Sequence, residues 1–429
     1  MRTVVNPSKK TWEFLCQRPQ FGRSGLEDIV AGILQKVRNE GDKSLFELSE
    51  QFDGAVPGNL KVPHSEIESA GRKIPEKLRK AIGIAKANIG KFHRAQLRNE
   101  KVSETTKGVK CWRKSVPIGK AGLYIPGGTA PLFSTVLMLA IPAKIAGCRE
   151  IILCTPPDKN GEVNPLILYA GFSAGVTDIF AVGGAQAIAA MAYGTESIPK
   201  VDKIFGPGNQ YVTKAKEMVQ LDGIAIDMPA GPSEVLVIAD KNADPAFIAS
   251  DLLAQAEHGP DSQVLLLTDT ADIIKSVKKE IQRQSGLLPR KEIALMALDN
   301  SSLILLDTLD ECMEFSNFYA PEHLIISVSD PLVLAEKVTN AGSVFLGKYS
   351  CESAGDYATG TNHTLPTNGH AKNFSGVSTE SFMKMITFQE MSAEGLKNLG
   401  PVIELMAEAE QLYGHKNAVT LRLKSLEND

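Results

Sequence analysis

Residues 118–157, IGKAGLYIPGGTAPLFSTVLMLAIPAKIAGCREIILCTPP, contain the pattern that decides the fold. Two short apolar runs, KAGLYI and EIILCT, have the length of buried strands and are bounded by Gly and Pro residues. The segment between them, STVLMLAIPAKIAGC, is longer and is expected to be a helix. A strand, a helix and a second strand in this order predict two parallel strands joined by a crossover helix.

The same alternation continues on the C-terminal side of this unit. Strand-like DIFAVGG and VDKIFGPG alternate with helical NPLILYAGFSAGV, AQAIAAMAYG and NQYVTKAKEMV. A second series begins near Pro232, where SEVLVIAD, SQVLLLTD, SLILLDT, HLIISV and GSVFLG are the expected strands. This rhythm predicts an α/β fold in which parallel sheets are covered by helices.

The two ends of the chain are expected to be mostly helical. In the tail, an apolar stripe formed by Val402, Leu405, Met406, Ala409 and Leu412 must dock on the body of the protein or on a second subunit. Residues 353–378, SAGDYATGTNHTLPTNGHAKNFSGVS, show no periodicity. Such a long loop inside a domain is uncommon and is usually functional or disordered.

Composition narrows the class of protein. The chain has 429 residues and a net charge of -4, without the basic excess of a nucleic-acid binder. The start of the chain lacks the apolar core of a signal peptide, and no apolar run is long enough to span a membrane. Six scattered cysteines form no CxxC pair, which argues against a disulfide framework. We therefore expect a cytoplasmic protein that binds neither nucleic acid nor membranes.

An acid and a base stand side by side in NFYAPEHLIISVSD, residues 317–330. Glu322 and His323 directly precede the apolar run LIISV, so they are expected at the start of a buried strand. A histidine titrates near neutrality and suits proton transfer. The alternative is a solvent-exposed pair at a junction between a loop and a strand.

Metal-ligand candidates are spread over three segments. Gln255 and His258 in AQAEHGPDSQ are spaced to share a helix face, although a histidine that complements the helix dipole is an alternative. Asp356 and His363 lie in the predicted long loop, and His415 lies in the tail. If the tail docks near the other residues, an amide oxygen, imidazoles and a carboxylate could surround a catalytic zinc ion.

Three glycine-bearing turns follow apolar strands: YIPGGTAP, AVGGAQA and FGPGNQ. None of them matches the GxGxxG fingerprint of dinucleotide-binding proteins. Glycine still lets a backbone approach a phosphate closely, and a helix N-terminus favours an anion. By themselves, these turns are only weak evidence for a nucleotide site.

Several long blocks, in the right order, resemble the histidinol dehydrogenase family. They are GLYIPGGTAPLFSTVLMLAIPAKIAGC, FGPGNQYVTKAK, DMPAGPSEVLVIAD, LLAQAEHGPDSQ, YAPEHL, SAGDYATGTNHTLPT and GHKNAVTLR. The resemblance implies two incomplete Rossmann-like domains with helical terminal segments in an intertwined dimer. The first domain, for substrate and zinc, would comprise residues 23–120 and 233–377, and the NAD domain residues 121–232. Residues 1–22 and 378–429 would be dimerisation segments.

The resemblance also implies oxidation of L-histidinol to L-histidine with two NAD and one zinc ion. Its catalytic residues fall on Glu322 and His323. The implied zinc ligands are Gln255, His258, Asp356 and His415, the last donated across subunits with Glu410. The implied substrate contacts are Ser233, His323, His363, Glu410 and the zinc ligands. The implied NAD contacts are Tyr124, Gln186 and Asn209.

Three alternatives remain open from the residues. The same fold could act on another hydroxylated substrate. A cysteine thioester could carry the second oxidation, with Cys148, Cys154 and Cys351 as the available thiols. The chain could also be a dimeric scaffold or metal store without activity. His370 has no comparable polar neighbours and is expected to be a surface histidine.

Overall fold

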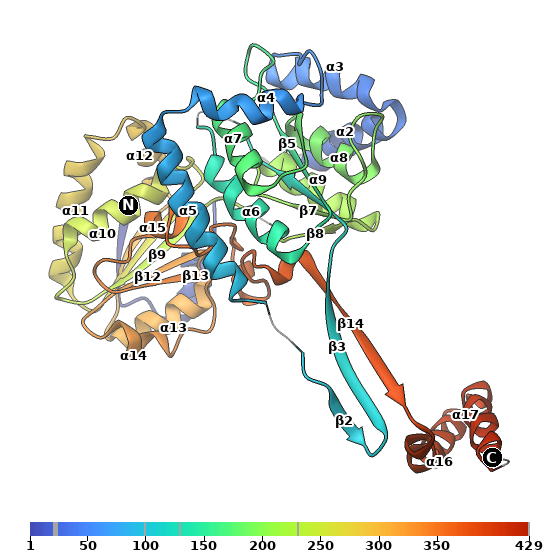
Figure 1. The fold of residues 1–429 in the computed structure, drawn as a ribbon. Helices are drawn as coiled ribbons and strands as arrows, with labels where there is room; N and C mark the ends of the chain where they lie inside the picture. The colour runs from blue at the N-terminus through green and yellow to red at the C-terminus, as the bar shows by residue number, and fades with distance from the viewer. Residues whose placement is uncertain (20–24, 98–99, 128–129, 230, 428–429) are drawn as a thin grey trace. The chain divides into compact units, whose positions relative to one another are not determined.

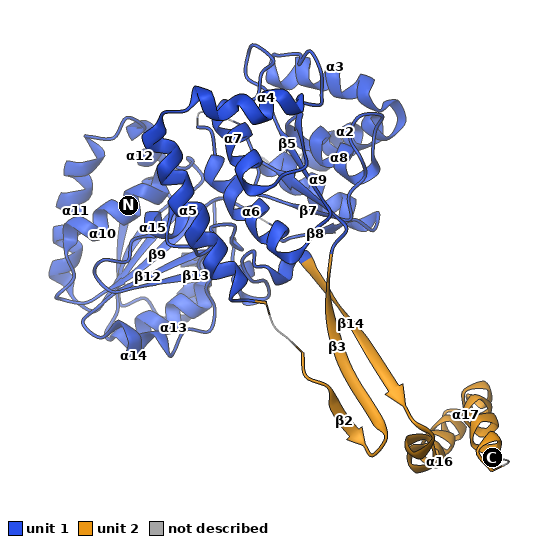
Figure 2. Ribbon diagram, viewed as in Figure 1, with its two compact units in different colours: residues 1–96, 118–382 blue, residues 97–117, 383–429 orange. Residues whose placement is uncertain are grey.

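The computed structural model describes residues 1–19, 25–97, 100–127, 130–229 and 231–427 (Figure 1). The chain divides into two compact units, one of residues 1–96 and 118–382 and the other of residues 97–117 and 383–429 (Figure 2). The predicted α/β class with parallel sheets is confirmed. The predicted segment boundary at residues 22 and 23 lies outside the described residues.

The first unit contains a five-stranded parallel sheet in the order β6-β5-β4-β7-β8. Its strands are β4 (Lys120–Tyr124), β5 (Glu150–Thr155), β6 (Asp178–Ala181), β7 (Lys203–Phe205) and β8 (Ala225–Ile226). The connecting helices are α6 (Phe133–Ala146), α7 (Pro165–Ala174), α8 (Gly184–Tyr193) and α9 (Gln210–Leu221). The strand–helix–strand unit predicted for residues 118–157 is therefore β4-α6-β5.

The same unit contains a six-stranded parallel sheet in the order β1-β11-β10-β9-β12-β13. Its strands are β1 (Arg2–Val5), β9 (Glu234–Ala239), β10 (Gln263–Thr268), β11 (Ser302–Leu305), β12 (His323–Ser327) and β13 (Ser343–Leu346). The helices that follow the strands are α10 (Pro245–Ala256), α11 (Ala271–Ser285), α12 (Lys291–Asp299), α13 (Leu309–Tyr319) and α14 (Pro331–Ala335). A short helix, α15 (Glu352–Tyr357), comes after β13.

Helices cover both faces of the six-stranded sheet (Figure 1), and alternate residues of its strands enter two separate cores. Val235 and Val237 of β9 face α10, α11 and α12. Leu236 and Ile238 face α13 and the short N-terminal helix α1 (Trp12–Leu15). The strand is consequently buried on both faces, as its nearly continuous apolar sequence requires.

The N-terminal helices join the five-stranded sheet. Helices α2 (Leu26–Glu40) and α3 (Asp42–Asp53) share an apolar core with α8 and α9. Helix α4 (His64–Ser69) packs against α7, and α5 (Glu76–Arg94) packs against α6. Among the helices of the described ranges, none is both long and apolar enough to cross a bilayer.

The second unit is an antiparallel ribbon followed by a helix pair. Strands β2 (Ser103–Thr106), β3 (Val109–Pro117) and β14 (Met383–Met391) pair in the order β14-β3-β2. Helices α16 (Ala393–Ala409) and α17 (Tyr413–Ser425) pack against each other. The mostly helical tail is present as α16 and α17, and the strand β14 precedes them. Within this unit the predicted apolar stripe stays exposed, with Leu405 at 70% and Met406 at 62%.

Candidate active site

Glu322 and His323 lie at the amino end of β12, between β9 and β13. Both side chains are buried, with exposed fractions of 6% and 3%. The alternative of a solvent-exposed pair is therefore wrong. The apolar run that follows places the pair here, because a strand with neighbours on both sides carries its first residues into the interior.

The His323 ring has one nitrogen engaged and one available. Its Nδ1 lies 3.1 Å from the carbonyl oxygen of Glu234, which can only accept a hydrogen bond. Neutral His323 therefore carries its proton on Nδ1 and presents a lone pair on Nε2. Nε2 is buried, has no hydrogen-bond partner among the described residues and lies 3.7 Å from Oδ1 of Asp356.

Glu322 is also hydrogen-bonded to the backbone of Glu234 on β9. Its Oε2 accepts a hydrogen bond from the backbone N–H of Glu234 (2.9 Å) and lies 3.5 Å from Nδ1 of His323. Burial raises the pKa of Glu322, against the opposing effect of His323. A carboxyl group with a raised pKa beside an imidazole can exchange protons at physiological pH.

Helix α15 contributes two carboxylates one turn apart. Asp356 lies on this helix, so its predicted placement in a loop was wrong. Glu352, which sequence reasoning missed, precedes it by four residues on the same face. Burial raises the pKa of Glu352 to about 8. Burial also acts to raise the pKa of Asp356, but the influence of His323, whose Nε2 lies 3.7 Å from Oδ1, outweighs it and lowers that pKa.

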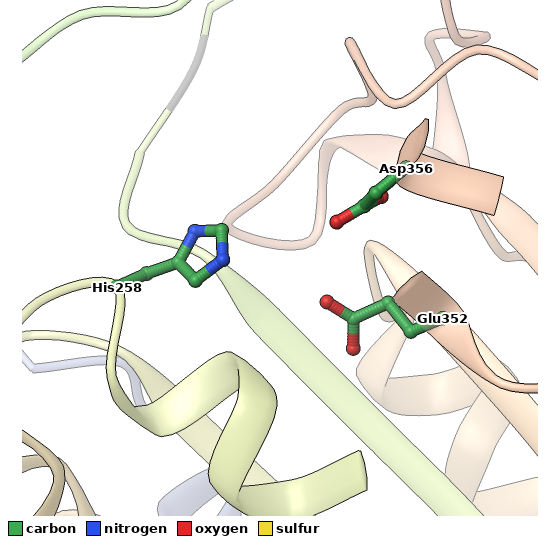
Figure 3. Close-up of side chains that lie close together, drawn as sticks. All are labelled: His258, Glu352 and Asp356. Carbon is green, nitrogen blue, oxygen red and sulfur yellow. The ribbon is translucent and has the colours of Figure 1, made fainter. Parts of the chain in front are cut away.

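His258, Glu352 and Asp356 form a group that could hold a metal ion, since one ligand atom from each lies within 4.8 Å of the others. Figure 3 shows the three side chains converging from α15 and from the segment after α10. His258 stands beyond the end of α10, not on it. The His258 side chain is exposed, but the protein atoms around its ring partly desolvate it and lower its pKa, which favours the neutral ring with a lone pair for a cation.

Gln255 lies in the last turn of α10 and is buried beside this group. With its amide oriented to satisfy its neighbours, it donates to the Glu352 carboxylate and accepts from the backbone N–H of Glu234 (3.2 Å). Gln255 therefore connects the metal-ligand group to the strand that holds Glu322 and His323.

His363 bridges two elements next to Asp356. Its Nε2 lies 3.0 Å from the hydroxyl of Thr135 on α6, and its Nδ1 lies 2.9 Å from the carbonyl oxygen of Asp356. Burial lowers the pKa of His363, so the ring is neutral. The expectation of a surface location for His370 was wrong, because this residue is half-buried and lines the same pocket.

These side chains, apart from that of Glu352, line a pocket of about 910 Å³ in the first unit. One wall is the amino edge of the six-stranded sheet and the segments beside it. The opposite wall is the carboxyl edge of the five-stranded sheet, with Pro126, Pro207 and Asn209. The predicted residues that line the pocket are Ser233, Gln255, His258, Glu322, His323, Asp356, His363 and Asn209.

The predicted NAD residues lie at or just after the carboxyl ends of strands in the five-stranded sheet. Asn209 caps α9 by accepting from the N–H groups of Tyr211 (3.0 Å) and Val212 (3.1 Å). Tyr124 is buried, and its hydroxyl accepts from the N–H of Gly184 (3.1 Å). Gln186 is also buried, with 1% exposed. In the YIPGGTAP turn, residues 128 and 129 lie outside the described residues.

Glu410 and His415 belong to the second unit. Glu410 caps the C-terminus of α16, and His415 lies in the first turn of α17. Both side chains are exposed within that unit. Their assignment to the active site stays a prediction.

Comparisons with known proteins agree with one another. The histidinol dehydrogenase family model matches residues 16–423. The histidinol dehydrogenase of Bacteroides thetaiotaomicron is 58% identical over 99% of this chain and 100% of its own length. That of Aliivibrio fischeri is 51% identical over 99% of this chain and 97% of its own length.

Solved structures include a near match and a distant one. A histidinol dehydrogenase from Elizabethkingia anophelis superposes with a TM-score of 0.97 at 54% identity, covering 100% of this chain and 99% of that chain. An acetylating aldehyde dehydrogenase from Geobacillus thermoglucosidasius gives a TM-score of 0.50 at 14% identity over 90% of this chain and 94% of that chain. The distant match is evidence of a shared fold alone.

Proposed function

The chain belongs to the histidinol dehydrogenase family, and from that premise we propose that it oxidises L-histidinol to L-histidine through L-histidinaldehyde, using two NAD molecules and one zinc ion. It is therefore an oxidoreductase of histidine biosynthesis, which we place in the cytoplasm. The observation that best supports the proposal is the free Nε2 of buried His323, beside a group of metal-ligand side chains in one pocket.

In the first oxidation, His323 acts as the general base. Its Nε2 would take the hydroxyl proton of histidinol, and NAD, when bound, would supply the acceptor for the hydride of the carbinol carbon. The carbonyl oxygen of Glu234 holds the Nδ1 proton throughout, so the ring keeps one orientation and one tautomer. Burial of the ring excludes bulk water from this proton transfer.

In the second oxidation, Glu322 activates water. The aldehyde must add water before it can lose another hydride, and the carboxylate of Glu322 can take a proton from that water. The N–H of Glu234 anchors one oxygen of this carboxylate. His323 lies beside this carboxylate, with Nδ1 3.5 Å from Oε2 of Glu322, so a positive charge gained by the ring in the first step would favour the ionised form of Glu322.

The donor set fits a divalent cation. We assign the ligands to Gln255, His258, Asp356 and His415 of the partner subunit, with Glu352 close enough to His258 and Asp356 to serve as a further oxygen ligand. To act as a ligand, Gln255 would turn its amide oxygen from the N–H of Glu234 toward the ion. Neutral imidazole and ionised carboxylate are donors that zinc accepts. A zinc ion here supplies positive charge to the buried carboxylates and open positions that orient the imidazole and amine of histidinol.

The carboxyl edge of the five-stranded sheet suits NAD. Ligands of open parallel sheets bind beyond the carboxyl ends of the strands. Pro207, Gly208 and Asn209 precede the first turn of α9 and line the pocket, so the amino end of this helix can face a phosphate, which would replace the Asn209 side chain as the acceptor for the N–H groups of Tyr211 and Val212. Tyr124 and Gln186 support the neighbouring turn at Gly184.

The cysteine thioester alternative gains no support from the placement of the thiols. Cys148 and Cys154 are buried, and burial raises the pKa of both, to about 11 for Cys148. A protonated, enclosed thiol is a poor nucleophile. Cys351 is exposed, and the lining of the pocket that contains His323 does not include it.

A combined assay tests the function. Purified protein should form two NADH for each L-histidinol consumed, lose this activity with a chelator and regain it with zinc. NADH formation from another alcohol but not from L-histidinol would favour the different-substrate alternative. Zinc binding without any turnover would favour a scaffold or metal store.

A further inference from the structure

One residue, Glu234, holds both catalytic side chains through its main chain. Its N–H donates to Oε2 of Glu322 (2.9 Å), and its carbonyl oxygen accepts from Nδ1 of His323 (3.1 Å). Glu234 is the first residue of β9, adjacent to the start of β12. A small rotation of its peptide groups would therefore move the hydrogen bonds of both catalytic residues.

The side chain of Glu234 is itself fixed by a buried ion pair. Nε and Nη2 of Arg18 donate to its two oxygens at 2.9 and 3.1 Å, a bidentate arrangement. The backbone N–H of Asn368 also donates to this carboxylate (2.7 Å). The side chain of Glu234 is 1% exposed, and that of Arg18 is 13% exposed.

Arg18 is equally constrained on its other sides. Its guanidinium group lies over the ring of Tyr319, 3.7 Å from the centroid. It donates to the carbonyl oxygens of Tyr319 (2.8 Å) and Cys16 (3.2 Å). A cation–π contact and hydrogen bonds from every guanidinium nitrogen fix the position of this side chain.

A buried ion pair is weak evidence for stability, because desolvation offsets the attraction between its charges. The contacts of this pair indicate instead that it orients the catalytic side chains next to Glu234. We propose that Arg18 and Glu234 are positioning residues that fix the tautomer of His323 and the orientation of Glu322. The proposal rests on the catalytic roles assigned above, and it makes the N-terminal segment part of the catalytic apparatus.

The same pair also fixes a wall of the pocket. Asn368, whose N–H donates to Glu234, lines the pocket. The hydroxyl of its neighbour Thr367 accepts from the N–H of Gly231, another lining residue. Loss of the ion pair would therefore loosen the strand start and the facing loop together.

The test compares Arg18→Ala with the double variant Arg18→Met/Glu234→Gln. The single variant leaves a buried carboxylate unpaired and can fail to fold, whereas the double variant removes both charges. We expect kcat for L-histidinol to fall about 10- to 100-fold in each folded variant, with KM and zinc content near wild type. The deuterium isotope effect at the carbinol carbon should rise as hydride transfer becomes limiting. Guanidinium ion below denaturing concentrations should restore part of kcat in Arg18→Ala alone.

A second readout does not require turnover. In the zinc-loaded protein, the ¹⁵N spectrum of labelled histidine should show His323 protonated on Nδ1 in the wild type and a tautomer mixture in the double variant, with His323→Asn used for assignment. Lys9→Met is the matched control, because Lys9 lies in the same segment but forms an exposed ion pair with Glu314. Wild-type kcat and an unchanged tautomer in the double variant would overturn the proposal. A wild type that leaves L-histidinol unoxidised would instead contradict the proposed function, and the tautomer measurement would still decide the positioning role.

Discussion

His323 illustrates how neighbouring groups prepare one side chain for chemistry. Burial alone would lower the pKa of His323, but the carboxylates of Glu352, Glu322 and Asp356 outweigh it and raise that pKa well above its ordinary value. A cation on Asp356 and Glu352 would balance their charge and leave the ring free to be neutral. Whether His323 is neutral, and can therefore act as a base, depends on the charge of the metal-ligand group beside it.

Replacing His323 by Asn should lower kcat for alcohol oxidation by about 10²–10⁴-fold, the usual contribution of a general base. Zinc content should stay at the wild-type level, because the assigned ligands are untouched. Steady-state kinetics and metal analysis check both expectations. His64→Asn is the matched control, since His64 is an exposed histidine on α4 beside Asp178. Equal kcat in His323→Asn and the wild type would exclude His323 as the base.

Glu352 should make the metal-free protein sensitive to pH. Its pKa is raised from 4.5 to about 8 in the folded protein, so folding favours its protonated form. Its contribution to the free energy of unfolding is complete below pH 4.5 and is lost as the pH rises through 8. The Tm of metal-free wild type should fall over this window more steeply than that of Glu352→Gln. Parallel Tm profiles for the two proteins would contradict this prediction.

At the level of single residues, the sequence indicated much of the pocket but not all of it. Residues as far apart as Ser233 and His363 line one cavity, as their common assignment implies. Glu352 was not predicted as a site residue because it belongs to none of the short motifs that mark the other site residues. The signal was present, since ESAGDY places two carboxylates four residues apart, the spacing of one helix face. Six residues are too few to show the periodicity that would have revealed α15.

At the level of elements, buried strands were predictable and exposed ones were not. The predicted strands of the two parallel series are short apolar runs, because strands covered on both faces contain few polar residues. The exposed edge strand β1, the two-residue β8 and the ribbon strands β2, β3 and β14 were not predicted. The ribbon carries mixed side chains, such as Lys110 and Glu390. Its strands β2 and β3 form a local hairpin, whereas β14 pairs with β3 across more than 260 residues. No local sequence pattern indicates a pairing strand that lies so far away in the chain.

The FGPGNQ turn between β7 and α9 requires glycine at residue 206. Gly206 has φ +122°, and a Cβ there would lie 2.1 Å from the carbonyl oxygen of Tyr124. Buried Lys216 donates to the carbonyl oxygen of Gly206 (2.8 Å), and Asp227 accepts from its N–H (2.8 Å). Lys216 and Asp227 also form an ion pair with each other. We call this ion pair and its two hydrogen bonds to Gly206 the clamp of the turn.

Breaking this clamp should destabilise the protein. Lys216→Met leaves Asp227 buried without its cation, which should cost about 3–5 kcal/mol in the free energy of unfolding. Lys216→Met/Asp227→Asn removes the charge and should recover part of the loss. Denaturant unfolding measures the series, with Lys80→Met at an exposed ion pair as the control. Equal stability of Lys216→Met and the control would show that the clamp is not needed.

At the level of the whole molecule, the second unit leaves apolar side chains without cover. Val402, Leu405, Met406 and Leu412 of the predicted stripe are exposed within that unit. Exposed apolar stripes of this kind usually mark interaction sites. The resemblance that implies an intertwined dimer offers a second copy of the chain as the partner, with His415 completing the other subunit's site.

Subunit mixing tests this exchange. His323→Asn and His415→Asn should each be nearly inactive. When equal amounts of the two variants are combined and their subunits reassort, about half of the dimers contain one subunit of each variant. One of the two sites in such a mixed dimer carries both wild-type residues. Activity should therefore recover to about a quarter of the wild-type value. Failure to recover, with mixed dimers confirmed by mass spectrometry, would place His323 and His415 in the same chain's site.

The most direct measurement is an anomalous difference map from zinc-loaded crystals, recorded on both sides of the zinc absorption edge. The account predicts one peak per subunit, about 2.0–2.2 Å from a nitrogen of His258 and an oxygen of Asp356, with His415 of the partner subunit as a further ligand. A peak that lies elsewhere, or no peak in active crystals, would contradict it.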